Sequence, residues 1–212
     1  MNTDTKPART PLQKVRIAIW LLVGLAAIGF AILLATRGNG PGSTAQSSRL
    51  DFMVGGPFTL TGADGNPFSS TALAGKPYAL FFGFTHCPDV CPATLARLAN
   101  LRQRLGGGAD SFNIVFVTVD PERDTPAEMR AYTQMFDTPV IALTGSPAQV
   151  QQVVKQHAAY AAKAPDNDAP DGYTMDHTAA VLLFDRKGEF QSTIALEEQD
   201  APALDKLKRL TA

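Results

Sequence analysis

The most informative segment of the sequence is YALFFGFTHCPDVCP, residues 78–92, in which an apolar run leads directly into a pair of cysteines. Its first eight residues, YALFFGFT, are almost continuously apolar, which is typical of a β-strand that is covered on both faces. Proline at position 92 suits the first position of a helix, which predicts a helix from residue 92 to about residue 105 with Cys91 as its N-cap. The segment therefore predicts a buried strand followed by a helix, as in α/β domains.

The remainder of the chain around this segment alternates between strand and helix patterns. Two capping boxes with proline at the first helical position, at residues 125–128 and 146–149, predict helices that end near residues 136 and 157. The other predicted elements are a hairpin that starts near residues 58–60 and turns at residues 64–65, strands over 114–119 and 140–143, a hairpin of strands 179–184 and 189–194, and a last helix over 201–210. This order predicts an α/β fold in which helices flank a central mixed β-sheet.

An N-terminal transmembrane helix is predicted over residues 17–35, a run of 19 residues without a charge. As a helix the run would be about 28 Å long, close to the roughly 30 Å of a bilayer's hydrocarbon core. It is longer than the apolar region of a signal peptide, it has no cleavage site nearby, and it has no polar face that would suit a core helix. Four bases precede the run and one base, Arg37, follows it closely, so residues 1–16 are predicted as a cytoplasmic tail.

The rest of the chain is predicted to lie in the periplasm, outside an inner (cytoplasmic) membrane that it crosses once. Residues 36–50 contain the Gly/Ser-rich stretch GNGPGSTAQSS and are predicted as a flexible linker to one domain, residues 51–212. Residues 49–212 carry 14 bases and 19 acids, a net charge of −5, and no basic stripe, which argues against nucleic acid as a partner. Phosphate-binding loops and serine-nucleophile motifs are absent, so hydrolase and kinase functions have no support.

Cys87 and Cys91, the two cysteines of the chain, are the first candidates for chemistry. Both lie near the positive end of the predicted helix, which favours the thiolate form. A structural disulfide would close a very short loop and add little stability. A redox dithiol is a second interpretation, although thioredoxin-type pairs have two intervening residues rather than three. A metal site is the third, because two thiolates are soft donors that favour Cu(I).

A metal site needs at least one more ligand, and the chain has three histidines, His86, His157 and His177. The ring of His86 would have to fold back across the cysteine loop. His157 ends a predicted helix and is expected to be a surface residue or a partner of the helix dipole at the C-terminus of that helix. His177 precedes a predicted strand, and a loop at that place can lie over the helix start. Two thiolates and one imidazole would form a three-coordinate site, which suits Cu(I) better than four-coordinate zinc.

Three motifs, in this order and spacing, resemble those of the Sco/SenC family of membrane-anchored copper chaperones. They are FGFTHCPDVCP at 82–92, VTVDPERDTP at 117–126 and MDHTAAVLLFD at 175–185. The resemblance extends from Gly55 to Phe190 and implies a thioredoxin-like fold. It also implies that Cys87 and Cys91 are a copper-binding and redox-active pair and that His177 is the third copper ligand.

The resemblance implies a function in the assembly of the CuA centre of cytochrome c oxidase. Subunit II of the oxidase and a periplasmic copper donor protein are the partners that it implies, and copper is expected as Cu(I), with Cu(II) left open. The alternative is a thiol–disulfide oxidoreductase that reduces the CuA-site cysteines of subunit II. Two local questions stay open: whether residues 120–124 are a simple turn, shape the site or dock a partner, and which course residues 164–172 take before His177.

Overall fold

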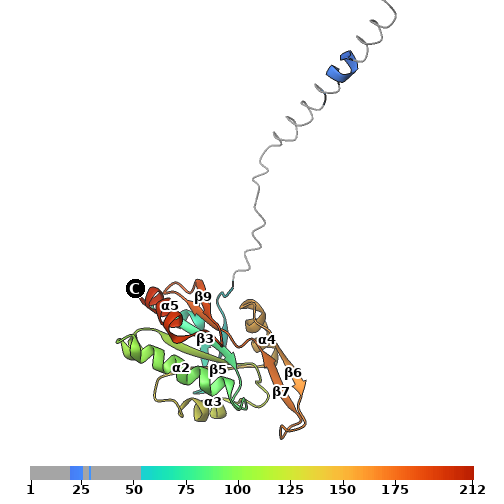
Figure 1. Cartoon of the computed structure of the whole chain (residues 1–212). Coiled ribbons are helices and arrows are strands. Elements are labelled where there is room, and N and C mark those ends of the chain that lie inside the picture. The colour runs from blue at the N-terminus through green and yellow to red at the C-terminus, as the bar shows by residue number, and fades with distance from the viewer. Residues whose placement is uncertain (1–19, 26–28, 30–53) are drawn as a thin grey trace, which may run out of the picture. The chain divides into compact units, whose positions relative to one another are not determined.

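The computed structural model describes residues 20–25, 29 and 54–212 and divides the chain into two units, Met1–Asp51 and Phe52–Ala212 (Figure 1). Residues 20–25 are helical with exposed side chains. Among the described residues, no helix is both long enough and apolar enough to cross a membrane. Most of the predicted membrane span lies outside the described residues, as do the predicted tail and linker, so these three assignments stay predictions.

A seven-stranded mixed sheet forms the centre of the second unit, in the order β2-β1-β5-β4-β3-β8-β9. Parallel pairing joins β3 to β4 and β4 to β5, whereas the pairs β1–β2, β1–β5, β3–β8 and β8–β9 are antiparallel. The strands are β1 (Thr59–Gly62), β2 (Pro67–Ser69), β3 (Tyr78–Gly83), β4 (Asn113–Thr118), β5 (Ile141–Thr144), β8 (Val181–Phe184) and β9 (Phe190–Ile194). The predicted mixed sheet is therefore confirmed, and β3 lies in its interior between β4 and β8.

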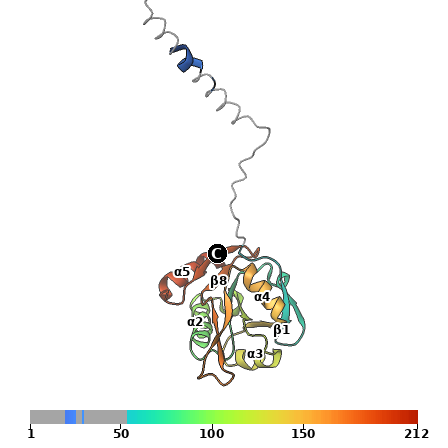
Figure 2. The same ribbon diagram turned by 90° about the vertical axis from the view of Figure 1, so that its right-hand side faces the viewer.

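Four helices flank this sheet, and Figure 2 shows α2 and α4 on opposite sides of the strands. They are α2 (Val90–Arg104), α3 (Pro126–Thr133), α4 (Pro147–Gln156) and α5 (Asp200–Thr211), with short 3-10 helices at Ser70–Leu73 and Gly108–Asp110. Both predicted capping boxes are present, because Thr125 pairs with Glu128 and Ser146 pairs with Gln149. Each box provides a hydrogen bond to a backbone N–H that the first helical turn leaves free.

All six residues of β3 are buried, and alternate side chains point to opposite faces of the sheet. On one face the ring of Phe81 lies 6.1 Å from that of Phe116, which in turn stacks on Tyr132 of α3. On the other face the ring of Phe82 lies 5.8 Å from that of His157, at the end of α4. The continuous apolar run thus exists because this strand has a helical layer on each side.

Helix α2 differs from the prediction at its start. It begins at Val90 with Asp89 as the N-cap residue, so Cys91 lies inside the first turn and is not the N-cap. The first helical hydrogen bond runs from the N–H of Ala93 to the carbonyl of Asp89 and is 3.1 Å long. Proline at position 92 is tolerated there because the first turn has N–H groups without helical partners, so the missing N–H costs nothing.

An additional hairpin, β6 (Ala161–Pro165) and β7 (Tyr173–His177), forms a separate two-stranded sheet that the sequence did not predict. Its register places Ala161 opposite His177, and residues 166–172 form its turn. Alanine, lysine, proline and aspartate are poor strand formers, which is why the local pattern gave no signal. The hairpin resolves the course of residues 164–172 and makes His177 the last residue of a strand.

Candidate metal and redox site

The two cysteines follow the end of β3 and meet at the start of α2. The N–H of Cys87 donates to the carbonyl of Phe84, which turns the chain back towards the helix. The N–H of Cys91 then donates to Sγ of Cys87 over 3.3 Å. Cys91 is fully buried and Cys87 is half-buried, and both are free thiols. The loop therefore presents one accessible sulfur above one buried sulfur.

Gly83, at the end of β3, makes the space for the buried sulfur. A Cβ atom at this position would lie 2.7 Å from Sγ of Cys91 and 2.8 Å from Cε2 of Phe116. Both distances are shorter than any van der Waals contact, so a side chain here would displace the sulfur. The sequence analysis missed this residue, although a glycine inside a buried strand commonly marks a close approach of another group.

His177 reaches the cysteines from the end of β7. Its Nε2 lies 3.8 Å from Sγ of Cys91, across 86 positions of sequence. Its Nδ1 lies 3.1 Å from the carbonyl oxygen of Thr178, which can only accept a hydrogen bond. Nδ1 therefore carries the proton, and the lone pair of Nε2 faces the sulfur. The rings of Phe81 and Phe84 contact the imidazole edge to face, with centroids 6.1 and 5.9 Å away, and fix its plane.

The pKa values of the two cysteines shift in opposite directions. The pKa of Cys87 falls to about 4, chiefly because the Cys91 side chain donates a hydrogen bond to its sulfur, and the backbone N–H groups of Cys91 and Asp89 add smaller contributions. The pKa of Cys91 is raised because its proton is held in that hydrogen bond and because the side chain is buried. Cys87 is consequently a thiolate at neutral pH, with the Cys91 proton shared between the two sulfurs.

The donor atoms suit a soft metal ion. At the bond lengths of zinc, about 2.3 Å to sulfur and about 2.05 Å to nitrogen, a trigonal ion holds the two atoms about 3.8 Å apart. This matches the separation between Cys91 and His177. Within the described part of the chain, no group of three or more His, Cys, Asp or Glu side chains is already arranged to hold a metal ion.

The other two histidines have different environments. His86 is partly exposed, and its Nδ1 lies 3.1 Å from the hydroxyl of Thr85 and 3.7 Å from the carboxylate of Asp124. Of the two alternatives for His157, a position at the surface is wrong, because only 1% of the residue is exposed. The residue is the C-cap of α4. Its Nδ1 donates to the carbonyl of Val153 over 2.8 Å, and three aromatic rings surround it. The C-terminal end of α4 turns into the core, which the sequence pattern does not reveal.

Residues 120–124 shape the loop that leads to Cys87. Asp124 is completely buried, and its carboxylate accepts hydrogen bonds from the N–H of Thr85 over 3.0 Å, from the Thr85 hydroxyl and from the Thr118 hydroxyl. Burial raises the pKa of Asp124. The Asp124 carboxylate thus connects Thr118, the last residue of β4, to Thr85, which lies two positions before Cys87. The open question about this segment is thus answered in favour of a structural function at the site.

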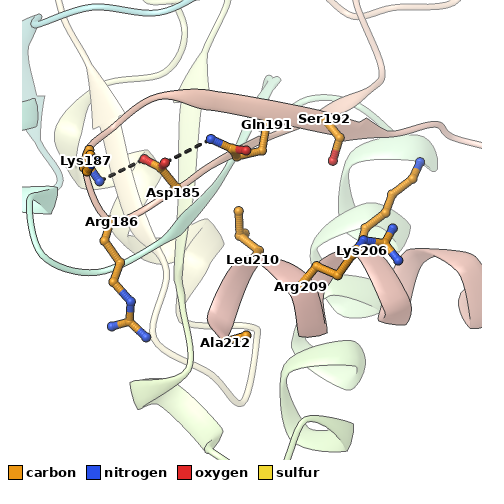
Figure 3. Close-up of a pocket in the computed structure, with 9 residues that line it drawn as sticks. All are labelled: Asp185, Arg186, Lys187, Gln191, Ser192, Lys206, Arg209, Leu210 and Ala212. Atoms are coloured by element: carbon orange, nitrogen blue, oxygen red, sulfur yellow. Dashed lines mark hydrogen bonds between the residues drawn. The ribbon is translucent and has the colours of Figure 1, made fainter.

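The β8–β9 turn and the end of α5 enclose a cavity of about 610 Å³ elsewhere on the domain (Figure 3). Its lining contains neither a cysteine nor a histidine. The lining residues are Asp185, Arg186, Lys187, Gln191, Ser192, Lys206, Arg209, Leu210 and Ala212. This cavity therefore contributes nothing to the thiol and imidazole site.

Solved structures with a similar fold support a comparison of the whole domain. ScoI of Bradyrhizobium japonicum with copper bound is 44% identical, with a TM-score of 0.66 over 74% of this chain and 99% of that chain. ScoI of Arabidopsis thaliana with copper bound is 33% identical, with a TM-score of 0.68 over 74% of this chain and 98% of that chain. Both identities are high enough that the likeness reaches beyond the fold.

Sequence comparisons lead to the same group of proteins. The SCO2-like protein RP587 of Rickettsia prowazekii is 30% identical over 88% of this chain and 91% of that protein. The mitochondrial protein SCO2 of Saccharomyces cerevisiae is 36% identical over 73% of this chain and 52% of that protein. The family model described as SCO1/SenC matches residues 46–212, which include the thiol pair and the histidine. The chain therefore belongs to the SCO1/SenC family, as the three motifs had indicated.

Proposed function

We propose that this protein binds copper through Cys87, Cys91 and His177 and delivers it during assembly of the CuA centre of cytochrome c oxidase. The observation that carries this proposal is the approach of the His177 imidazole to the thiol pair, with Nε2 3.8 Å from Sγ of Cys91. Two sulfurs and one nitrogen are a soft donor set that prefers Cu(I). Copper is the cargo in this function, so the site has to release it as well as bind it.

Relatives support copper as the ion and the oxidase as the destination. Copper is bound in the solved structures of ScoI from Bradyrhizobium japonicum and Arabidopsis thaliana. Another solved relative is described as a member of the Sco family of cytochrome c oxidase assembly proteins. Subunit II is the partner that we propose here, because the CuA centre belongs to it, and a periplasmic copper donor would load the site.

Anaerobic titration of the reduced protein with Cu(I) against a competing chelator tests the three-ligand site. One ion is expected per chain, and X-ray absorption is expected to show two sulfurs and one nitrogen. His177→Ala is expected to weaken Cu(I) binding by more than the about tenfold to hundredfold that outer partners of a metal ligand contribute. His86→Ala is the matched control, since His86 contacts Thr85 rather than a cysteine. Equal affinities of the two variants would reject His177 as a ligand.

A second candidate function, reduction of the CuA-site cysteines of subunit II, is favoured by the acidity of Cys87. Its pKa of about 4 and its partial exposure provide an accessible thiolate. That thiolate would attack a target disulfide and form a mixed disulfide, which releases the first target thiolate. Cys91 would then pass its proton to the released target thiolate and attack the Cys87 sulfur of the mixed disulfide, releasing the second target thiolate. Two electrons pass to the target, and a Cys87–Cys91 disulfide remains.

Loss of the imidazole separates the two functions. Copper delivery requires His177, whereas the exchange of electrons requires only the two sulfurs. In cells that carry His177→Ala, loss of oxidase activity with unchanged thiol exchange supports delivery of copper. Full oxidase activity in these cells would instead support the thiol–disulfide function and reject copper delivery as the main activity.

We further propose that residues 17–35 anchor the protein in the inner membrane as a single span, with the domain in the periplasm. The support is the uncharged run and the excess of bases before it. Fractionation of cells, followed by protease treatment of spheroplasts, tests this arrangement. The protein is expected in the membrane fraction and its domain is expected to be digested from outside. Protection of the domain in intact spheroplasts would reject the orientation.

A further inference from the structure

The hairpin that carries His177 is held in place chiefly by side chains. Within residues 54–212, β6 and β7 pair only with each other and do not join the seven-stranded sheet. The main-chain hydrogen bond from Thr178 to Tyr160 closes the base of the hairpin but does not fix it to the sheet. Contacts between its side chains and the rest of the domain therefore decide how closely the imidazole approaches the cysteines.

Arg123 makes several of these contacts at once. Its guanidinium group lies 3.9 Å from the centroid of the Tyr173 ring, and its Nη1 donates to the Tyr173 carbonyl over 3.3 Å. Its Nε donates to the carboxylate of Asp120, which also accepts a hydrogen bond of 3.2 Å from the Tyr173 hydroxyl. The Arg123 side chain is only 11% exposed, so water screens this arrangement weakly. One planar cation thus holds the ring and the main chain of β7.

The same guanidinium group reaches the wall of the site. It lies 5.9 Å from the centroid of the Phe84 ring, and that ring lies 5.9 Å from the ring of His177. The carbonyl of Phe84 also accepts a hydrogen bond from the N–H of Cys87. Arg123 is therefore in contact both with the hairpin that carries the imidazole and with the residue that packs between the imidazole and the cysteine loop.

A second contact between the hairpin and residues 120–124 is weaker. Lys163 of β6 lies 4.5 Å from the centroid of the Tyr173 ring and donates to Glu122 over 2.7 Å. Both charged side chains are about half exposed, and exposed ion pairs contribute little to stability. The buried arginine is for that reason the contact to test.

We propose that Arg123 is a positioning residue that holds the β6–β7 hairpin so that His177 stays over the thiol pair; this inference rests on the proposed copper site. Lysine would keep the charge at this position but would lose the planar stack on Tyr173 and the fork of donors. Arg123→Lys is expected to lower the Cu(I) affinity about tenfold, the lower end of the effect of outer partners on metal ligands.

A double-mutant cycle on the full reduced chain tests this proposal. Cu(I) affinities are measured for the wild type, Arg123→Lys, His177→Ala and the double variant. If Arg123 acts through the imidazole, its substitution weakens binding in the wild type and has no effect once His177 is absent. Arg130→Lys is the matched control, because Arg130 donates to the carbonyl of Ala63 and does not contact the hairpin.

Hydrogen exchange of the metal-free protein provides a readout that does not depend on copper. Faster exchange of the β6 and β7 amides is expected in Arg123→Lys and in Tyr173→Leu, which removes the same stack from the other side. Unchanged Cu(I) affinity and unchanged amide exchange in both variants would overturn the proposal. It would also be overturned if Arg123→Lys lowered the Cu(I) affinity equally in the wild type and in the His177→Ala variant. If His177→Ala itself leaves Cu(I) binding unchanged, the proposed copper site fails, and the exchange data alone then decide whether Arg123 holds the hairpin.

Discussion

Substitution of Gly83 by alanine tests whether the end of β3 is built around the buried sulfur. The added Cβ would lie 2.7 Å from Sγ of Cys91, so the sulfur would have to move by about 0.7 Å to reach an ordinary contact of 3.4 Å. Overpacking of a core costs about 1–3 kcal/mol, and the loss of glycine's freedom in the unfolded chain returns up to about 1 kcal/mol. The φ of Gly83 is not in the left-handed region, so no backbone strain is added. A net loss of about 1–2 kcal/mol is expected.

Thermal unfolding and Cu(I) titration measure the two consequences of this substitution. For a domain of this size, the expected loss lowers the Tm by about 2–8 °C. The Cu(I) affinity is expected to fall about tenfold, because ligands in a working site are held to within about 0.5 Å. Val117→Ile is the control, since it overpacks the opposite face of the same sheet beside Phe82. Equal copper affinities of Gly83→Ala and the control would refute the argument that Gly83 sets the position of the sulfur.

Three further predictions follow from the pKa values and the buried polar groups. Cys87, with a pKa of about 4, is expected to react with iodoacetamide at nearly equal rates at pH 8 and pH 6, whereas an ordinary thiol would slow about 75-fold; a drop of that size would contradict the thiolate. Burial lowers the pKa of His157, so at low pH the unfolded chain binds a proton that the folded protein does not bind. The free energy of unfolding is therefore expected to decrease as the pH falls below about 6.5, by up to about 1.4 kcal/mol per pH unit. Urea unfolding checks this, and the difference is expected to vanish in His157→Leu. Asp124→Ala leaves two hydroxyl groups and the N–H of Thr85 without their acceptor and is expected to cost at least about 2 kcal/mol in the same assay; a loss below about 0.5 kcal/mol would show that water replaces the carboxylate.

The position of the imidazole also has consequences for release of the cargo. Because His177 belongs to a hairpin outside the main sheet, it can move without breaking any strand pairing of the core. The cysteines, by contrast, lie at the junction of β3, a strand of the main sheet, and α2. Under the proposed function, this division would place the two sulfur donors beside the main sheet and the imidazole donor on the separate hairpin.

Local sequence patterns predicted the features that depend on neighbouring residues. The apolar run of β3, the two capping boxes and the thiol pair at a helix start were all predicted, because local rules of burial, capping and proline geometry decide them. The motifs also identified the family and singled out His177 among three histidines. The local rules gave the wrong start for α2, which begins two residues earlier than predicted.

The tertiary structure alone decided the features that join distant parts of the chain. The contact between Cys91 and His177 spans 86 positions, and the hairpin that makes it consists of residues with weak strand preference. The burial of His157 depends on three aromatic rings from other elements, and the space for the Cys91 sulfur depends on the absence of a side chain at Gly83. Such contacts are set by the packing of whole elements against one another, which no short stretch of sequence contains.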